Sequence, residues 1–240
     1  MRKIVRTVSH SKRYTAARAT GDRLTLHEPA EAIGLVKKTA TAKFPETVEM
    51  AVRLGIDPRQ SDQNVRGITS LPHGTGKNRR VAVLAKGDAL KQAEAAGADE
   101  VGSDELVTKI AGGYKNFDVL IATPEMAPTM AKIGKVLGPK TPNKKSGTLT
   151  DDVKTAVEEI KKATRIEYRT DKAGIVHMPI GKANFTDEQL MENFLAAVTA
   201  LVKAKPSTAK GRYITGVTLS STMGPGFRID PVVAAKAVGV

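Results

Sequence analysis

The sequence predicts an α/β protein of two domains, and three observations support this prediction. In the middle of the chain, residues 68–159, short apolar runs alternate with helical stretches, which is typical of βαβ units and a mostly parallel sheet. In the outer segments, residues 1–67 and 160–240, one strand instead alternates cleanly between apolar and polar side chains. The charge also differs, because the middle holds 13 basic and 12 acidic residues and the outer segments hold 25 and 13.

The first outer segment should contain a helix and a strand. The helix is expected from Pro29 to about Ala42, because proline at the first helical position loses no hydrogen bond. The strand is expected over Thr47–Ile56, with its apolar and polar side chains on opposite faces: Val48, Met50, Val52, Leu54 and Ile56 against Thr47, Glu49, Ala51 and Arg53.

The middle of the chain predicts buried strands and the helices between them. Strands are expected at 81–85 and 117–122, because both runs are short and apolar throughout. Helices are expected at 88–96, ending at Gly97, and at 104–111, where Ser103 is a candidate cap. After the strand at 117–122, helical sequence is expected through Val136.

The second outer segment returns to basic sequence. Strands at 165–170 and 175–180 flank the turn Asp171–Gly174, which indicates a hairpin. Thr186 and Gln189 form a capping box for a helix that reaches Lys203, and a last strand is expected over 213–221. If the outer segments fold together, residues 1–67 plus 160–240 form a basic domain beside a near-neutral domain of residues 68–159.

A formal net charge of +13 indicates a polyanionic partner, because each cation that meets a phosphate releases condensed counterions. A membrane partner is disfavoured, since the longest apolar stretches, such as 194–202, are too short to span a bilayer and no signal peptide is evident. With no cysteine, the chain has no disulfide and no thiolate metal site. Five Phe, four Tyr and no Trp favour structured RNA over single strands.

Motifs for catalysis are incomplete or missing. Gly74–Lys77 resembles a phosphate loop, but Leu71 and Asn78 stand where that motif needs a glycine and a hydroxyl residue. No dinucleotide fingerprint follows the strand at 81–85, and the four histidines lack metal-ligand spacing. We therefore expect no catalytic activity, no cofactor and no small-molecule substrate. The alternative, a nucleotide-dependent activity of the middle domain, would require nucleotide binding.

Two local sequences are suited to approach an RNA backbone. Ser220–Gly226 offers three hydroxyls and glycines that allow close contact, although an ordinary Gly-Pro turn would have the same residues. The polar face of the strand at 47–53 is the second, although every half-buried strand has a polar face. Glu49 on this face could accept hydrogen bonds from 2′-hydroxyls or base amino groups.

Several segments together resemble a known family. They are 42–44 (AKF), 54–57 (LGID), 61–67 (SDQNVRG), 71–76 (LPHGTG), 116–119 (NFDV), 136–139 (VLGP), 203–206 (KAKP) and 222–224 (TMG). In this order they closely resemble the bacterial family of large-subunit ribosomal protein 1, over about residues 28–230. The resemblance implies a discontinuous first domain, an α/β sandwich with an antiparallel sheet, and an inserted Rossmann-like domain with three α/β layers.

The resemblance also implies a function without a cofactor. Members bind large-subunit ribosomal RNA in the cytoplasm and form the mobile stalk beside the E site, which is implicated in the release of deacylated tRNA. Many bacterial members also repress translation of their own messenger RNA. The resemblance assigns RNA contacts to Phe44, Thr47, Glu49, His177, Gly181, Ser221, Thr222, Met223 and Gly224. Charge alone adds Lys43, Arg53, Lys172 and Lys182.

One loop departs from the family pattern. Residues 138–145 (GPKTPNKK) are shorter than the usual sequence, and Lys144 replaces a second proline. Fewer residues and one fewer fixed φ angle should change the shape of this loop. The resemblance therefore does not extend to contacts that the middle domain makes through this loop, for instance with tRNA.

Overall fold

The computed structural model describes residues 10–22, 25–144 and 147–236. Their contacts form two compact units: unit 1 comprises residues 1–67, 71–73 and 168–240, and unit 2 comprises 68–70 and 74–167. The second junction was expected at residue 160. Ile160 instead lies within helix α6 (Val153–Lys161), and the boundary follows Glu167. Because α6 belongs to unit 2, the chain returns to unit 1 later than expected.

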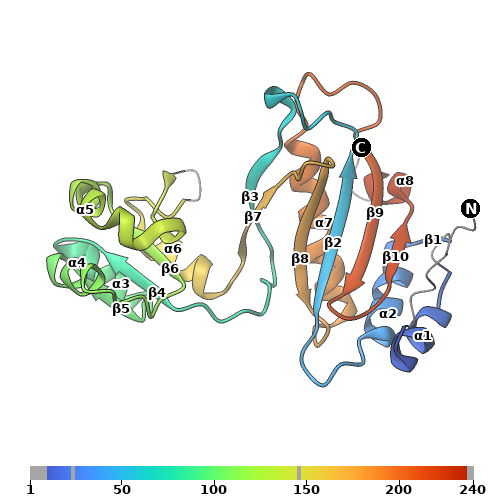
Figure 1. Cartoon of the computed structure of the whole chain (residues 1–240), viewed down its shortest axis with the longest axis horizontal. Coiled ribbons are helices and arrows are strands. Elements are labelled where there is room, and N and C mark those ends of the chain that lie inside the picture. Colours follow the sequence, from blue (N-terminus) through green and yellow to red (C-terminus); the bar gives the residue numbers. More distant parts are fainter. Residues whose placement is uncertain (1–9, 23–24, 145–146, 237–240) are drawn as a thin grey trace, which may run out of the picture. The chain divides into compact units, whose positions relative to one another are not determined.

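The main sheet of unit 1 has the order β1 (Leu26–His27), β10 (Gly226–Ile229), β9 (Ile214–Ser221), β2 (Thr47–Leu54) and β8 (Ile175–Lys182). Neighbours are antiparallel except for β1 and β10, which are parallel. Strand β2, from the first outer segment, therefore lies between β9 and β8, which both come from the second outer segment (Figure 1). Strand β8, which contains Pro179, forms one edge of the sheet.

Alternation along β2 explains why one face of this sheet is covered. Val48, Met50 and Val52 are fully buried, whereas Glu49 and Arg53 are exposed. Helices α2 (Pro29–Thr39), α7 (Asp187–Lys203) and α8 (Pro231–Lys236) pack on the strands. Burial of the apolar face against these helices stabilises the unit. The opposite face carries exposed polar side chains such as Glu49 and Arg53.

Unit 2 is a three-layer α/β structure. Its parallel sheet has the order β5 (Glu100–Gly102), β4 (Val81–Leu84) and β6 (Val119–Ala122). Helices α4 (Asp104–Ala111) and α5 (Ala127–Leu137) share one core cluster with the sheet, and α3 (Asp88–Ala95) and α6 share the other. All four residues of β4 are buried, as expected for a strand covered on both faces. The expected fold class is confirmed.

The remaining elements are short. Strands β3 (Arg66–Ser70) and β7 (Arg165–Arg169) form a two-stranded sheet, and helix α1 (Lys12–Ala19) precedes the first strand. Three short 3₁₀ helices complete the described part: η1 (Ser61–Gln63), η2 (Pro124–Met126) and η3 (Gly138–Lys140). Residue 145 of the unusual 138–145 loop lies outside the described residues.

The expected hairpin at 165–180 was wrong in its pairing. The turn forms as predicted, since the Asp171 carboxylate accepts from the Ala173 and Ile175 N–H groups, both at 2.8 Å, and Gly174 has a φ of 73°. The two strands nevertheless enter different sheets, because β7 pairs with β3 and β8 pairs with β2. A single bridge between Thr170 and Val176 remains of the hairpin.

Two helix termini also differ from expectation. Helix α2 ends at Thr39 rather than near Ala42, because Ala40 leaves the helical region with a ψ of 78°. Ser103 precedes α4 but its side chain makes no capping hydrogen bond. The capping box at the start of α7 is confirmed, since Thr186 accepts from the Gln189 N–H and the Gln189 side chain accepts from the Thr186 N–H.

Replacing Thr186 with alanine should lower the free energy of unfolding by about 1 kcal/mol, because the Gln189 N–H at the start of α7 loses its acceptor. Denaturant unfolding monitored by circular dichroism would measure the change. Thr186→Ser is the matched control, because serine keeps the hydroxyl and should leave stability near that of the wild type. Equal stability of the alanine and serine variants would show that this cap contributes nothing.

Candidate nucleic-acid interface

The turn Ser221–Gly224, called here the 221–224 turn, connects β9 to β10. The Gly224 N–H donates to the Ser221 carbonyl oxygen at 3.2 Å and closes the turn. The Thr222 hydroxyl oxygen accepts from the Thr47 N–H at 2.9 Å and donates to the Thr47 carbonyl oxygen at 3.3 Å. The turn is therefore fixed to the first residue of β2, 175 positions away in the sequence.

Glu46 ties the same turn to a second loop. Its side chain is buried at 1% exposure, and its carboxylate accepts from two backbone N–H groups. One belongs to Met223 in the turn, at 2.9 Å, and the other to Ala42 in the loop after α2, at 2.8 Å. A charged acceptor makes stronger hydrogen bonds than a neutral one. Glu46 therefore holds two exposed loops in a fixed relation to each other.

The surroundings of Glu46 favour its charged form. Burial acts to raise the pKa of this carboxyl group, because desolvation penalises the charge. The hydrogen bonds from Ala42 and Met223 stabilise the carboxylate, and the nearby Ser221 hydroxyl and Arg13 guanidinium act in the same direction. These contributions outweigh burial, so the pKa of Glu46 lies below its ordinary value of 4.5.

The lowered pKa predicts that acid removes the stabilising effect of Glu46. A carboxyl group with a lower pKa in the folded than in the unfolded state stabilises the fold above the unfolded value and loses this effect as the pH falls through the folded value. The difference in unfolding free energy between wild type and Glu46→Gln should therefore be constant near neutral pH and shrink below about pH 4.5. Denaturant titrations across this range would measure it. A difference that does not depend on pH would contradict the assignment.

Arg13 adds a third contact from helix α1. Its guanidinium donates to the Met223 carbonyl oxygen and to the Thr41 hydroxyl, both at 3.3 Å. The 221–224 turn thus contacts Arg13 in helix α1 and the adjacent residues Glu46 and Thr47 at the start of β2, two separate places in the first 50 residues. A turn held in this way presents its backbone in one conformation, which reduces the entropy lost on binding.

Gly224 and Ser221 form the inner side of the turn. A Cβ atom on Gly224 would lie 2.4 Å from the Ser221 hydroxyl oxygen, so no larger residue fits without a shift. Ser221 itself is buried at 4% exposure, with its side chain below the surface. The expectation that its hydroxyl contacts RNA therefore does not fit its position. Ser221 supports the turn from inside.

Two large apolar side chains are exposed beside this turn. Phe44, in the loop tied by Glu46, is 49% exposed, and Met223, in the turn, is 48% exposed. Two lysines, distant from each other in the sequence, lie close to this loop in the fold. Lys182 donates to the Thr47 hydroxyl at 2.9 Å and to the Pro45 carbonyl oxygen at 3.4 Å, and Lys43 is exposed next to Phe44. Exposed apolar and basic groups around a rigid turn are suited to bases and phosphates.

The other predicted residues lie beneath this surface or further along the sheet. Gly181, opposite Val48, is buried, and a Cβ there would meet Leu190 at 2.8 Å. Along the exposed face, Glu49 pairs with Ser220 and His177 pairs with Ala51. Two predicted cations do not join the turn. Arg53 and Lys172 lie at the opposite end of β2, near Ile175.

Sequence reasoning missed Arg13 and Glu46. For Glu46 a signal existed. It lies two, four and six positions before Val48, Met50 and Val52, so its side chain is expected on the same buried side as theirs. A carboxylate on the buried side needs hydrogen-bond partners inside the protein. For Arg13 no local pattern distinguishes it from its basic neighbours.

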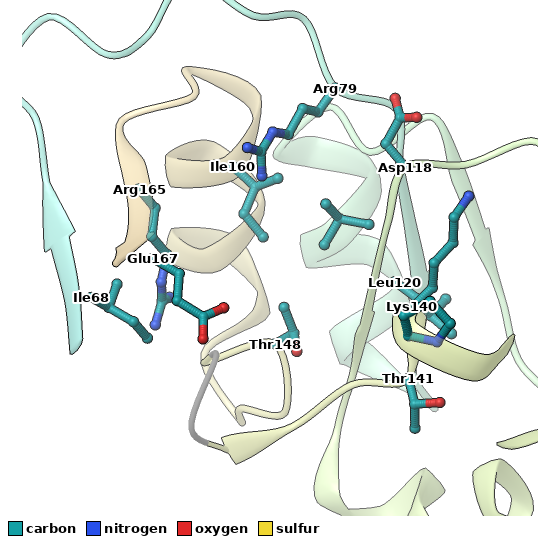
Figure 2. A pocket seen from close by; sticks show the side chains of 12 residues that line it. Ile68, Arg79, Asp118, Leu120, Lys140, Thr141, Thr148, Ile160, Arg165 and Glu167 are labelled. Carbon is teal, nitrogen blue, oxygen red and sulfur yellow. The ribbon is translucent and has the colours of Figure 1, made fainter. Parts of the chain in front are cut away.

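Unit 2 has a pocket of its own, with a volume of about 220 Å³. Figure 2 shows Arg165 and Glu167 beside each other on one wall and Lys140 and Thr141 on another. Its charges are mixed, and Arg165 is paired with Glu159 at 3.4 Å. Lys140 lies over the Phe117 ring and donates to the Phe117 carbonyl oxygen. The basic side chains of this pocket are thus partly engaged by the unit itself.

The described residues contain neither a membrane-spanning helix nor a cluster of metal ligands. None of their helices combines the length and apolar character that crossing a bilayer requires. Within the same residues, no three His, Asp or Glu side chains are grouped so that they could hold a metal ion.

Comparison with protein-family models matches residues 36–225 to the ribosomal protein L1p/L10e family. The chain belongs to this family. The matched range includes β2, the whole of unit 2 and the 221–224 turn. As a member of the L1p/L10e family, the chain is a ribosomal protein of the large subunit that binds ribosomal RNA, and the family is structural rather than enzymatic.

Proposed function

We propose that this chain binds the stalk region of large-subunit ribosomal RNA through the end of the unit 1 sheet that carries the 221–224 turn. With this RNA it forms the mobile stalk beside the E site, contacts the tRNA there and assists release of deacylated tRNA. One observation carries the proposal: a turn fixed by Thr222, Glu46 and Arg13 lies beside two exposed apolar side chains, Phe44 and Met223.

Each group at this surface has a chemical use in RNA recognition. Gly224 lets the backbone come close to a ribose or phosphate, and Phe44 and Met223 can pack on unstacked bases. Lys43 and Lys182 can contact phosphates. Glu49 can accept from 2′-hydroxyls, which distinguishes RNA from DNA. The combination favours recognition of a folded RNA by its shape together with a few base edges.

A salt series of binding constants tests this proposal. The full chain is titrated with a folded stalk RNA fragment and with a random RNA of equal length. The stalk RNA should bind about a thousandfold more tightly near physiological salt, because specific contacts add to charge attraction. Equal affinity with the same steep salt dependence would show that the protein is a nonspecific polyanion binder, and the proposed function would fail.

The same surface supports a second role as a translational repressor that binds the chain's own messenger RNA. A messenger RNA that folds like the stalk RNA would meet the same fixed turn. Reporter repression by the free protein tests this role. Thr222→Val should reduce repression and stalk binding together, whereas loss of stalk binding with full repression would show that two different surfaces are used.

A further inference from the structure

A groove of about 550 Å³ opens on unit 1 at the opposite end of β2 from the 221–224 turn. Arg53 of β2, Arg228 of β10 and Arg212, which precedes β9, all line it. Arg53, which charge alone had added to the predicted RNA contacts, therefore lies in this groove and not at the turn. The groove therefore gathers three arginines from separate parts of unit 1.

The groove lies on the face of the sheet that the helices leave exposed. Ala51 and Thr218 contribute short side chains from β2 and β9, and Gly216 contributes only backbone. The floor of the groove therefore leaves room between the long arginine side chains. Leu26 and Val232, exposed at 56% and 44%, also line the groove.

The three guanidinium groups are available for a ligand. All three arginines are exposed, and among the described residues none of them forms an ion pair with an acidic side chain. Asp230 is the acidic residue that lines the groove, and its carboxylate already accepts from the Val232 N–H at 2.8 Å. The described lining therefore carries a net positive charge without internal neutralisation.

The backbone around the arginines is fixed. The Gly55 N–H donates to the Tyr213 carbonyl oxygen at 2.6 Å, and a Cβ atom on Gly55 would lie 2.2 Å from the Arg212 carbonyl oxygen. Glycine at this position allows the segment with Arg212 to lie directly against the end of β2. The Thr215 hydroxyl donates to the Arg53 carbonyl oxygen at 2.9 Å and joins β9 to β2 at the same place.

We propose that this groove binds the phosphodiester backbone of RNA flanking the part that the 221–224 turn recognises. The inference rests on the proposed function. Guanidinium groups bind phosphate oxygens through paired hydrogen bonds, so three unpaired arginines match a run of phosphates. The groove is continuous with the proposed surface, because Thr47, Glu49, Ala51 and Arg53 follow one another along the polar face of β2.

The distances favour an extended polyanion over a small anion. Arg53 lies six positions after Thr47, which corresponds to about 20 Å along a strand. An RNA segment of this length brings one phosphate per nucleotide, and Glu49 between the two ends meets hydroxyls rather than phosphates. The turn then supplies recognition and the groove supplies additional affinity through charge.

The test uses the full chain with Arg53, Arg212 and Arg228 all changed to glutamine. Its matched control changes Lys91, Lys109 and Lys154, three exposed lysines on helices of unit 2, to glutamine and so removes the same charge. Binding constants are measured against salt for stalk RNAs whose flanking helix is lengthened stepwise. Thermal unfolding of both variants verifies that they are folded.

For the wild type, affinity should rise as the flanking helix is lengthened and then reach a plateau. The groove variant should lose this rise, bind the longest RNA at least about tenfold more weakly, and show a salt slope lower by about 2 to 3, since each lost phosphate contact lowers it by about 0.9. The shortest RNA should bind wild type and variant nearly alike. The control should keep the wild-type rise.

A groove variant that keeps both the rise and the slope of the control would overturn the proposal. If poly-glutamate then bound the wild type but not the groove variant, the groove would belong to an acidic protein segment instead. Failure of the proposed function looks different, because the wild type itself would not distinguish stalk RNA from random RNA.

Discussion

Replacing Glu46 with alanine should lower the free energy of unfolding of unit 1 by about 3 kcal/mol. The reason is that the partly buried N–H groups of Ala42 and Met223 both lose a charged acceptor, at about 1.5 kcal/mol each. Amide hydrogen exchange is the most direct measurement, because the Ala42 and Met223 N–H groups should exchange faster in the variant than in the wild type. Denaturant unfolding would give the total.

The matched control for Glu46 is Glu49, three residues further along the same strand. Its side chain is exposed on the other face, so Glu49→Ala should change stability by less than about 0.5 kcal/mol. A Glu46→Ala variant as stable as the Glu49 variant would show that the buried carboxylate does not fix the turn. Binding of stalk RNA should also fall for Glu46→Ala, because the 221–224 turn and the loop with Phe44 would no longer be held together.

Changing Thr222 to valine should weaken binding of stalk RNA by about 2 kcal/mol, or roughly thirtyfold, while random RNA binds as before. Valine has the shape of threonine but cannot pair with the Thr47 backbone, so the turn loses its contact with β2. Thr222→Ser restores the hydroxyl and should recover most of the affinity. Competition binding with both RNAs measures these changes.

The result for random RNA decides what Thr222 does. An equal loss on stalk and random RNA would mean that valine disturbs the whole surface, not the recognition of one RNA. A valine variant that binds stalk RNA like the wild type would show that the turn does not need this contact. Thermal unfolding of the three proteins separates loss of binding from loss of the fold.

The sequence predicted those elements whose pattern is long enough to be read locally. Alternation from Val48 to Val52 gave the position and the buried face of β2, and the wholly apolar Val81–Leu84 gave a strand covered on both sides. The strands β1 and β5 were missed, because two or three residues do not establish a period. The partner of β7 was wrong, because pairing depends on β3, which is distant in the sequence.

The candidate site was predictable in part for a similar reason. Thr222, Met223 and Gly224 form a compact motif, and the structure brings Thr47 to it through a hydrogen bond. The groups that hold the turn could not be read from the motif, since Arg13 lies 210 residues away from Met223. Arg53 had been assigned by charge, and charge reports the number of cations in a segment but not their position on the fold.

Strand β8 has a consequence for how this protein behaves before it meets RNA. An edge strand offers unpaired backbone groups to a second molecule, and long exposed edges are starting points for aggregation. Pro179 lies in the middle of β8 and lacks an N–H, so this edge cannot form a continuous ladder with another strand. Pro179→Thr should therefore increase light scattering of the concentrated free protein, and unchanged solubility would show that the edge is protected in another way. Increased scattering of the variant would show that Pro179 keeps the edge of this sheet from pairing with a second molecule.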